Sequence, residues 1–257
     1  MIRITLLAAA LALITGLRAM ATETQVMVRE KAKDAKFIGS SLGGAHVLIR
    51  STTNGAILAE GLTQGSTGST QRIMREPHTR GMTLTDDNTA GFLATLDLQE
   101  PTFVRIEVAS PYGHRSAQVH ASTELWLIPG KHILGDGIIL EIPGFIIDIL
   151  SPRTHRYISL AEVKDQPLSV QANIVMMCGC TINEDGLWDS NDMEVRGILK
   201  RNGELAGEIG LDWKSTNLFE AALPLTEPGQ YHLTVYAYDP NSGNTGVEQV
   251  YFIITGE

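Results

Sequence analysis

The chain has 257 residues, 43% of them hydrophobic, and a formal net charge of −9 at pH 7. This length suits one large domain or two modest ones. The acidic balance argues against a nucleic-acid or anionic-membrane surface, because both need clustered Lys and Arg.

The first residues, 1–21, predict a secretory signal peptide. Arg3 supplies the positive start, residues 6–14 form a short apolar stretch, and Ala19-Met20-Ala21 matches the small-x-small cleavage pattern. The apolar stretch is shorter than the roughly 20 residues that a membrane-spanning helix needs. We therefore expect a periplasmic or secreted protein that is not integral to the membrane after cleavage. Removing Arg3 and Arg18 changes the formal charge from −9 to −11.

Beyond residue 21, helical periodicity is nearly absent. Short alternating or β-branched runs recur between Gly, Pro, Asn and Asp, which predicts an all-β fold of two sandwich domains. In the first domain, residues 22–152, Asn54-Gly55 predicts a hairpin turn because both residues tolerate positive φ. The predicted strands of this domain are residues 45–50, 57–59, 91–98 and 102–108.

Part of this first domain, residues 26–108, resembles the transthyretin-like or carboxypeptidase-regulatory-like β-sandwich. The resemblance rests on short motifs: Ala45-x-Val47, Thr53-Asn54-Gly55, Leu58-Ala59-x-Gly61-x-Thr63, the strand entry at Gly91-Phe92, and Pro101-x-x-Val104. Such domains are scaffolds or accessory modules that face carbohydrates or proteins, so the resemblance implies no catalytic role.

An apolar block follows at residues 138–150. Glu141, Pro143 and Asp148 interrupt it, so it is unsuited to cross a bilayer as a helix. One interpretation is two buried strands joined by a Pro-Gly turn. The other is a docking surface for a partner or for the second domain. The polar, proline-containing segment at residues 151–156 predicts a domain boundary within about ten residues of it, and we divide the chain between residues 152 and 153.

The second domain, residues 153–257, shows the clearest strand patterns. Asn202-Gly203 predicts a second tight hairpin. The predicted strands are residues 168–176, 194–200, 206–211, 218–225, 228–239 and 250–254. The pattern Gly229-x-Tyr231-x-Leu233 resembles the tyrosine corner of immunoglobulin-like domains, which implies an Ig-like sandwich. Leu233 stands where antibody domains carry a cysteine, so the cross-sheet disulfide of those domains is absent.

The only two cysteines lie in Met176-Met177-Cys178-Gly179-Cys180, where a predicted strand enters a carboxylate-rich loop. Thiolates and thioethers are soft ligands that select Cu(I). In an extended segment the two cysteines would point to one side, because strand side chains alternate. We therefore predict a copper or other soft-metal site whose ligands are Cys178, Cys180, Met177, Met176 and Met193. Zinc would need further ligands, for which His155 and His232 are the candidates.

Two alternatives for this segment remain open. The cysteines could form a disulfide that serves redox or sulfur-relay chemistry, since so short a loop adds little stability. They could also be small apolar residues at the edge of a core. We expect a non-enzymatic binding or accessory protein of the cell envelope with a protein partner, and we predict no catalytic residues. The alternatives are a metal-free structural or interaction module and a thiol redox or sulfur-carrier protein.

Two weaker motifs point to other functions. Residues 184–194 include five carboxylates that could bind calcium, but their spacing does not match an EF-hand. Residues 39–43 match G-x-S-x-G, yet no helix is predicted after them, as a nucleophile elbow would require. We therefore expect a solvated loop and no serine hydrolase.

Overall fold

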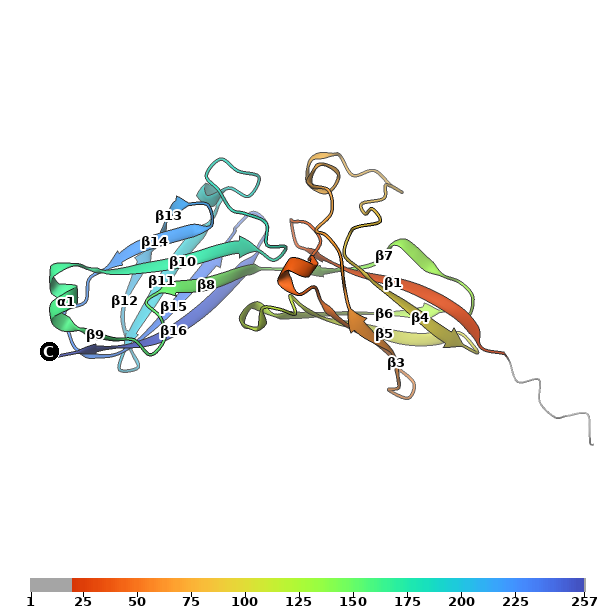
Figure 1. Ribbon diagram of the computed structural model, residues 1–257, viewed down its shortest axis with the longest axis horizontal. Helices are drawn as coiled ribbons and strands as arrows, with labels where there is room; N and C mark the ends of the chain where they lie inside the picture. Colours follow the sequence, from red (N-terminus) through yellow and green to blue (C-terminus); the bar gives the residue numbers. More distant parts are fainter. Residues whose placement is uncertain (1–19, 257) are drawn as a thin grey trace, which may run out of the picture.

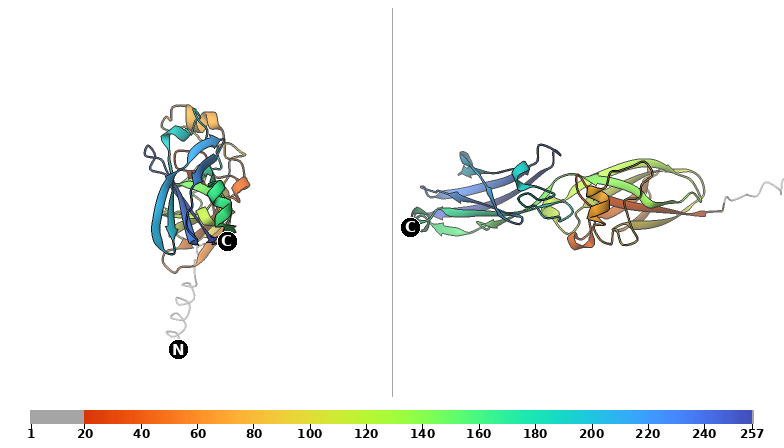
Figure 2. Two further views of the ribbon diagram at one scale, coloured as in Figure 1. Left: turned by 90° about the vertical axis from the view of Figure 1, so that its left-hand side faces the viewer. Right: turned by 90° about the horizontal axis from the view of Figure 1, so that it is seen from above.

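The computed structural model describes residues 20–256, which form two pairs of β-sheets placed end to end (Figure 1). The start of the first strand and the C-terminus lie at opposite ends of this elongated arrangement, and the view from above shows the same order (Figure 2). The predicted signal peptide, residues 1–21, lies almost entirely outside the described residues.

The first sandwich packs a three-stranded sheet against a four-stranded sheet. The first sheet has the order β4 (Phe92–Leu98), β1 (Thr22–Ala32), β7 (Ile133–Ile142). The second has the order β3 (Ile57–Leu62), β2 (His46–Ser51), β5 (Thr102–Ser110), β6 (Val119–Leu127). Alternate residues of β1, β2 and β5, such as Val28, Val47 and Ile106, are fully buried between the sheets. This alternation is the expected pattern for sheets with one solvated face.

The second sandwich packs a four-stranded sheet against a five-stranded sheet. The first has the order β13 (Asp212–Ser215), β14 (Leu218–Leu223), β10 (Leu168–Met176), β8 (Phe145–Ser151). The second has the order β12 (Glu204–Gly210), β11 (Glu194–Arg201), β15 (Gly229–Tyr238), β16 (Thr245–Thr255), β9 (Tyr157–Ser159). One short helix, α1 (Leu160–Asp165), follows β9. The all-β prediction is therefore confirmed.

Local turn signals were reliable guides to pairing. Asn54-Gly55 lies between the paired strands β2 and β3, and Asn202-Gly203 lies between β11 and β12. Both Asn202 and Gly203 have positive φ, as this type of hairpin turn requires. The Tyr231 hydroxyl donates a hydrogen bond of 2.8 Å to the carbonyl of Glu227. The tyrosine corner implied by the Ig-like resemblance is therefore present.

The chain crosses between the sandwiches earlier than the sequence suggested. β7 pairs with β1 of the first sandwich, whereas β8 pairs with β10 of the second. The crossing is therefore at Pro143-Gly144, within about ten residues of the predicted segment, and the division between residues 152 and 153 falls after β8 of the second sandwich. The apolar block contains two strands, as one interpretation expected. They form no hairpin, because each strand buries its side chains in a different core.

The segment 39–43 lacks the geometry of a nucleophile elbow. A short 3-10 helix at Ser40–Leu42 ends at Gly43, whose φ is +79°, and the next element is the strand β2. Because no α-helix follows the serine, this motif match carries no hydrolase chemistry.

Candidate functional site at the domain junction

The cysteine segment forms a tight turn, not the extended strand that the metal prediction assumed. β10 ends at Met176, and Val175 forms an isolated bridge with Thr181. Inside this bridge the N–H of Gly179 donates a hydrogen bond of 2.7 Å to the carbonyl of Met176. The N–H of Met176 donates one of 3.1 Å to the carbonyl of Cys180. Gly179 has a φ of +72°, which other residues rarely adopt. We call residues 176–180 the disulfide turn.

Cys178 and Cys180 are joined in a disulfide, with a Cα–Cα distance of 5.3 Å. Their exposed fractions are 2% and 9%. The bonded sulfurs offer no thiolate, so a copper ion would need prior reduction of this bond. The disulfide was one of the alternatives that the sequence left open, and the soft-metal site stays a prediction for the reduced chain.

The three methionines of the predicted ligand set do not share one surface. Met176 and Met177 are both buried. Met176 and the half-buried Met193 line a hollow of about 150 Å³, whereas the methyl group of Met177 lies against Gly144. Within residues 20–256, no group of three or more His, Cys, Asp or Glu side chains is placed to hold a metal ion.

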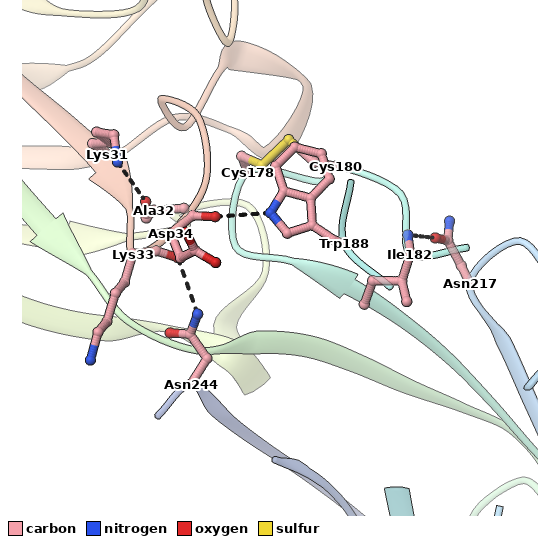
Figure 3. The surroundings of a disulfide bond; sticks show 10 residues. All are labelled: Lys31, Ala32, Lys33, Asp34, Cys178, Cys180, Ile182, Trp188, Asn217 and Asn244. Atoms are coloured by element: carbon pink, nitrogen blue, oxygen red, sulfur yellow. Dashed lines mark hydrogen bonds between the residues drawn. A yellow bond between two sulfur atoms is a disulfide. The ribbon is translucent and has the colours of Figure 1, made fainter. Parts of the chain in front are cut away.

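The carboxylates of the loop after the turn have local structural roles. Asp189 accepts hydrogen bonds from the backbone N–H groups of Asp185 at 3.2 Å and Asn191 at 2.9 Å. The loop is fastened to the β13–β14 turn by Asn217, whose Oδ1 accepts the N–H of Ile182 at 2.8 Å (Figure 3). These contacts fit the expectation of an ordered, solvated loop.

The same loop reaches across to the first sandwich. The indole nitrogen of Trp188 donates a hydrogen bond of 2.8 Å to the carbonyl of Asp34, in the turn that follows β1 (Figure 3). Burial, together with the nearby Asp239, raises the pKa of Asp34 above its ordinary value. Trp188 therefore connects residues 154 positions apart in the chain.

Asn244, in the turn between β15 and β16, is a second connection. Its side chain is completely buried, donates to the carbonyl of Lys33 at 3.1 Å and accepts the N–H of Gly144 at 2.8 Å. One amide thus binds the residue after β1 and the crossing segment together. Figure 3 shows the bond to Lys33. A buried amide with both ends satisfied favours one arrangement of the segments around it.

The disulfide turn itself contacts the first sandwich through Gly179. A Cβ at Gly179 would lie 3.3 Å from a methyl carbon of Leu42. A side chain at this position would therefore press on Leu42, and glycine lets the turn lie beside that residue. The turn is therefore part of the junction between the domains.

A histidine–carboxylate contact crosses the junction at β8. Nε2 of His114, in the segment between β5 and β6, lies 3.1 Å from Oδ1 of Asp148. Glu248 of β16 accepts the N–H of Ile149. Burial, followed by the charge of Asp148, raises the pKa of Glu248, while this hydrogen bond and His114 oppose the shift. The two sandwiches are thus joined by polar contacts from several loops.

The predicted distal histidine ligands lie elsewhere. His232 stacks on Tyr251, with ring centroids 4.2 Å apart, and the N–H of His155 donates to the carbonyl of Tyr251. Tyr251 is six residues along β16 from Thr245 at the junction end. This corresponds to about 20 Å at the usual rise of a strand. The histidines therefore do not join the disulfide turn.

Comparisons with known proteins add no family or activity. No family model and no curated protein matches the chain. It is similar to an engineered protein (14% identity, TM-score 0.32, covering 50% of this chain and 24% of that chain). It is also similar to the fibronectin(III)-like modules of Clostridium thermocellum CbhA (10% identity, TM-score 0.26, covering 91% and 94%). A third match is the N-terminal four Ig domains of Dscam1 (8% identity, TM-score 0.23, covering 94% and 45%).

This chain spans about a quarter of the engineered protein. None of the three TM-scores reaches 0.5, so these similarities carry no argument about function. The sheets themselves define the class, an all-β protein built from sandwich domains with an Ig-like second domain. None of the helices in residues 20–256 is long and apolar enough to span a bilayer.

Proposed function

We propose that this protein is an exported, non-catalytic interaction module that holds two β-sandwich domains in a fixed line. The disulfide turn belongs to the joint between them, and the outer sheet faces serve as binding surfaces. Ig-like sandwiches host many unrelated roles, so this proposal rests on the junction and not on the fold class.

The observation that carries the proposal is the set of contacts that join the two sandwiches. Trp188, Asn244 and the disulfide turn of the second sandwich all contact the turns that follow β1, and His114 contacts β8. Relative domain motion is the usual expectation for a chain with two domains. Polar contacts from several loops oppose such motion, which suits a protein that presents two surfaces at a set spacing.

Export is supported by the predicted signal peptide and by the disulfide, because disulfides persist mainly in oxidising compartments. The proposed location is therefore the periplasm or the outside of the cell. An interaction role also fits the exposed aromatic side chains of both sandwiches, which include Trp126 at 62% exposure.

The mass of the full chain in native envelope extract tests this proposal. We expect a complex that is larger than one chain and that persists when Cys178 and Cys180 are both changed to serine. A chain that migrates alone in extract would contradict an interaction role. A complex that is lost only in the double serine variant would favour a role for the sulfur atoms instead.

A soft-metal role is the second candidate, and the closeness of the two sulfurs favours it. Reduction of the disulfide would place two thiols two residues apart, directly after Met177 in the sequence. Such ligands suit Cu(I). In this candidate the metal would replace the disulfide as the link within the turn.

A further inference from the structure

The outer face of the five-stranded sheet of the second sandwich has an unusual composition. Four of the six tyrosines in the chain lie on it, as the pairing of β15, β16 and β9 shows. Tyr251, Tyr157 and Val247 have exposed fractions of 54%, 68% and 54%. We call this surface the tyrosine face. Its uncharged residues are Tyr157, Ile198, His232, Thr234, Tyr236, Tyr238, Val247, Gln249, Tyr251 and Ile253, and its charged residues are Glu194, Arg196, Lys200 and Glu208.

The side chains of the tyrosine face point away from the core of the sandwich. The alternate residues of the same strands, such as Leu233, Val235 and Phe252, are buried in that core. The solvated face of an antiparallel sheet is ordinarily polar. Here tyrosine, valine and isoleucine occupy it, and tyrosine is enriched where proteins contact one another.

The charges of the tyrosine face balance one another. Arg196 of β11 lies 3.3 Å from Glu194 and 3.9 Å from Glu208. Lys200 is the remaining charged residue of this face, and no described acidic group pairs with it. The face is thus neutral on a chain whose net charge is −9. Two copies of so acidic a chain would repel each other least where these faces meet.

The size of the face also suits a dimer. The strands β12, β11, β15, β16 and β9 have 7, 8, 10, 11 and 3 residues. At about 4.8 Å between strands and about 3.3 Å per residue, they cover roughly 600 Å². A stable complex buries about 600–1,000 Å² on each partner, so the sheet face reaches the lower end of this range. Sheet faces pack against each other at about 10 Å, as they do within a sandwich. A surface that is neutral and carries both charge signs can be complementary to itself, as a twofold interface requires.

We propose that the protein forms a twofold-symmetric dimer in which the tyrosine faces of two copies pack against each other. The occupant of the face is a second copy of this chain. The dimer rests on the proposed interaction role and gives it a surface and a partner.

Analytical ultracentrifugation of the purified full chain tests the dimer. We expect a mass of two chains at high concentration. Val247→Glu and Tyr251→Glu each place a charge in the interface, and we expect them to weaken the dimer at least tenfold. Trp126→Glu is the matched control, because it adds the same charge at an exposed aromatic site of the other sandwich. Circular dichroism confirms that each variant is folded.

Reversing the charges of two residues on the tyrosine face provides a second test of the dimer. Lys200→Glu gives each face two excess negative charges and should weaken the dimer, while adding Glu208→Lys restores neutrality and should strengthen it again. A single-chain mass at every concentration would overturn the proposal, as would a dimer that only Trp126→Glu disrupts. If the purified chain is monomeric but forms a larger complex in extract, the interaction role stands and the dimer is wrong.

Discussion

Glu30 is a carboxyl group inside the core of the first sandwich. It follows Val26 and Val28 on the inward side of β1, and its exposed fraction is 1%. Neither carboxylate oxygen has a partner with good hydrogen-bond geometry. Burial raises its pKa to about 7, and the nearby Thr63 hydroxyl and Arg29 oppose that shift only in part. The ordinary pKa of a glutamate is 4.5, so folding favours the protonated form of Glu30 relative to the unfolded chain.

Glu30 should therefore make stability depend on pH. A raised folded-state pKa contributes stability that is complete below pH 4.5 and is lost as the pH rises through about 7. The difference corresponds to about 3 kcal/mol. Glu30→Gln should abolish most of the decline in unfolding free energy across this range, measured by urea denaturation at a series of pH values. Glu100→Gln, at an exposed turn, should leave the decline unchanged. A Glu30→Gln profile as steep as that of the wild type would contradict the assignment.

The prediction of a copper site depends on two further residues, Cys178 and Cys180. Reduced protein, titrated with Cu(I) against a competing chelator, should bind one ion if the sulfurs form a soft-metal site. The oxidised protein should bind none, because its sulfurs are bonded to each other. Met193→Leu should weaken binding less than the loss of both cysteines. Binding that persists after both cysteines are changed to serine would exclude the site.

Among the elements, those with local signals were predictable. The limits of β10 coincide with the predicted strand at residues 168–176, because its residues alternate between core and surface. The sequence analysis does not predict β1, because Glu30 occupies an inward position and interrupts the apolar alternation after Val28. The sequence analysis does not predict β6, whose inward side mixes Val119, Leu125 and Leu127 with the small residues Ala121 and Thr123. The crossing at Pro143-Gly144 was hidden within one continuous apolar block.

The junction loops could not be predicted at all. The cysteine pair drew attention to the right segment, but its sequence gave no sign of the contact between Gly179 and Leu42. Trp188 and Asn244 carry no local signal, because their partners across the junction lie at least 100 residues away. Contacts of this kind depend on how two finished sandwiches meet, and no local periodicity encodes them.

The loop that carries Trp188 should therefore contribute to stability through one specific bond. Trp188→Phe keeps an aromatic ring but removes the hydrogen bond to Asp34, which should cost about 1 kcal/mol. Trp126→Phe is the matched control, because Trp126 is exposed and none of the hydrogen bonds among residues 20–256 involves its indole. We expect the control to change the unfolding free energy by less than about 0.5 kcal/mol. Equal effects of the two substitutions in urea denaturation would show that the Trp188 bond is unimportant.

At the scale of the whole molecule, the junction determines what the protein can do. Two sandwiches in one line separate the start of β1 from the C-terminus by the full length of the structure (Figure 2). The tyrosine face lies on one sandwich only, so a fixed junction would set the direction in which the other sandwich projects from a dimer. A flexible junction would remove that directional control.

Residual dipolar couplings of the backbone N–H groups, measured on the full chain, test the fixed junction most directly. If the junction holds the sandwiches in one arrangement, a single alignment tensor fits the couplings of both with the domain orientation of this structure. Two tensors of different magnitude, one for each sandwich, would show that the domains move independently and would contradict the account.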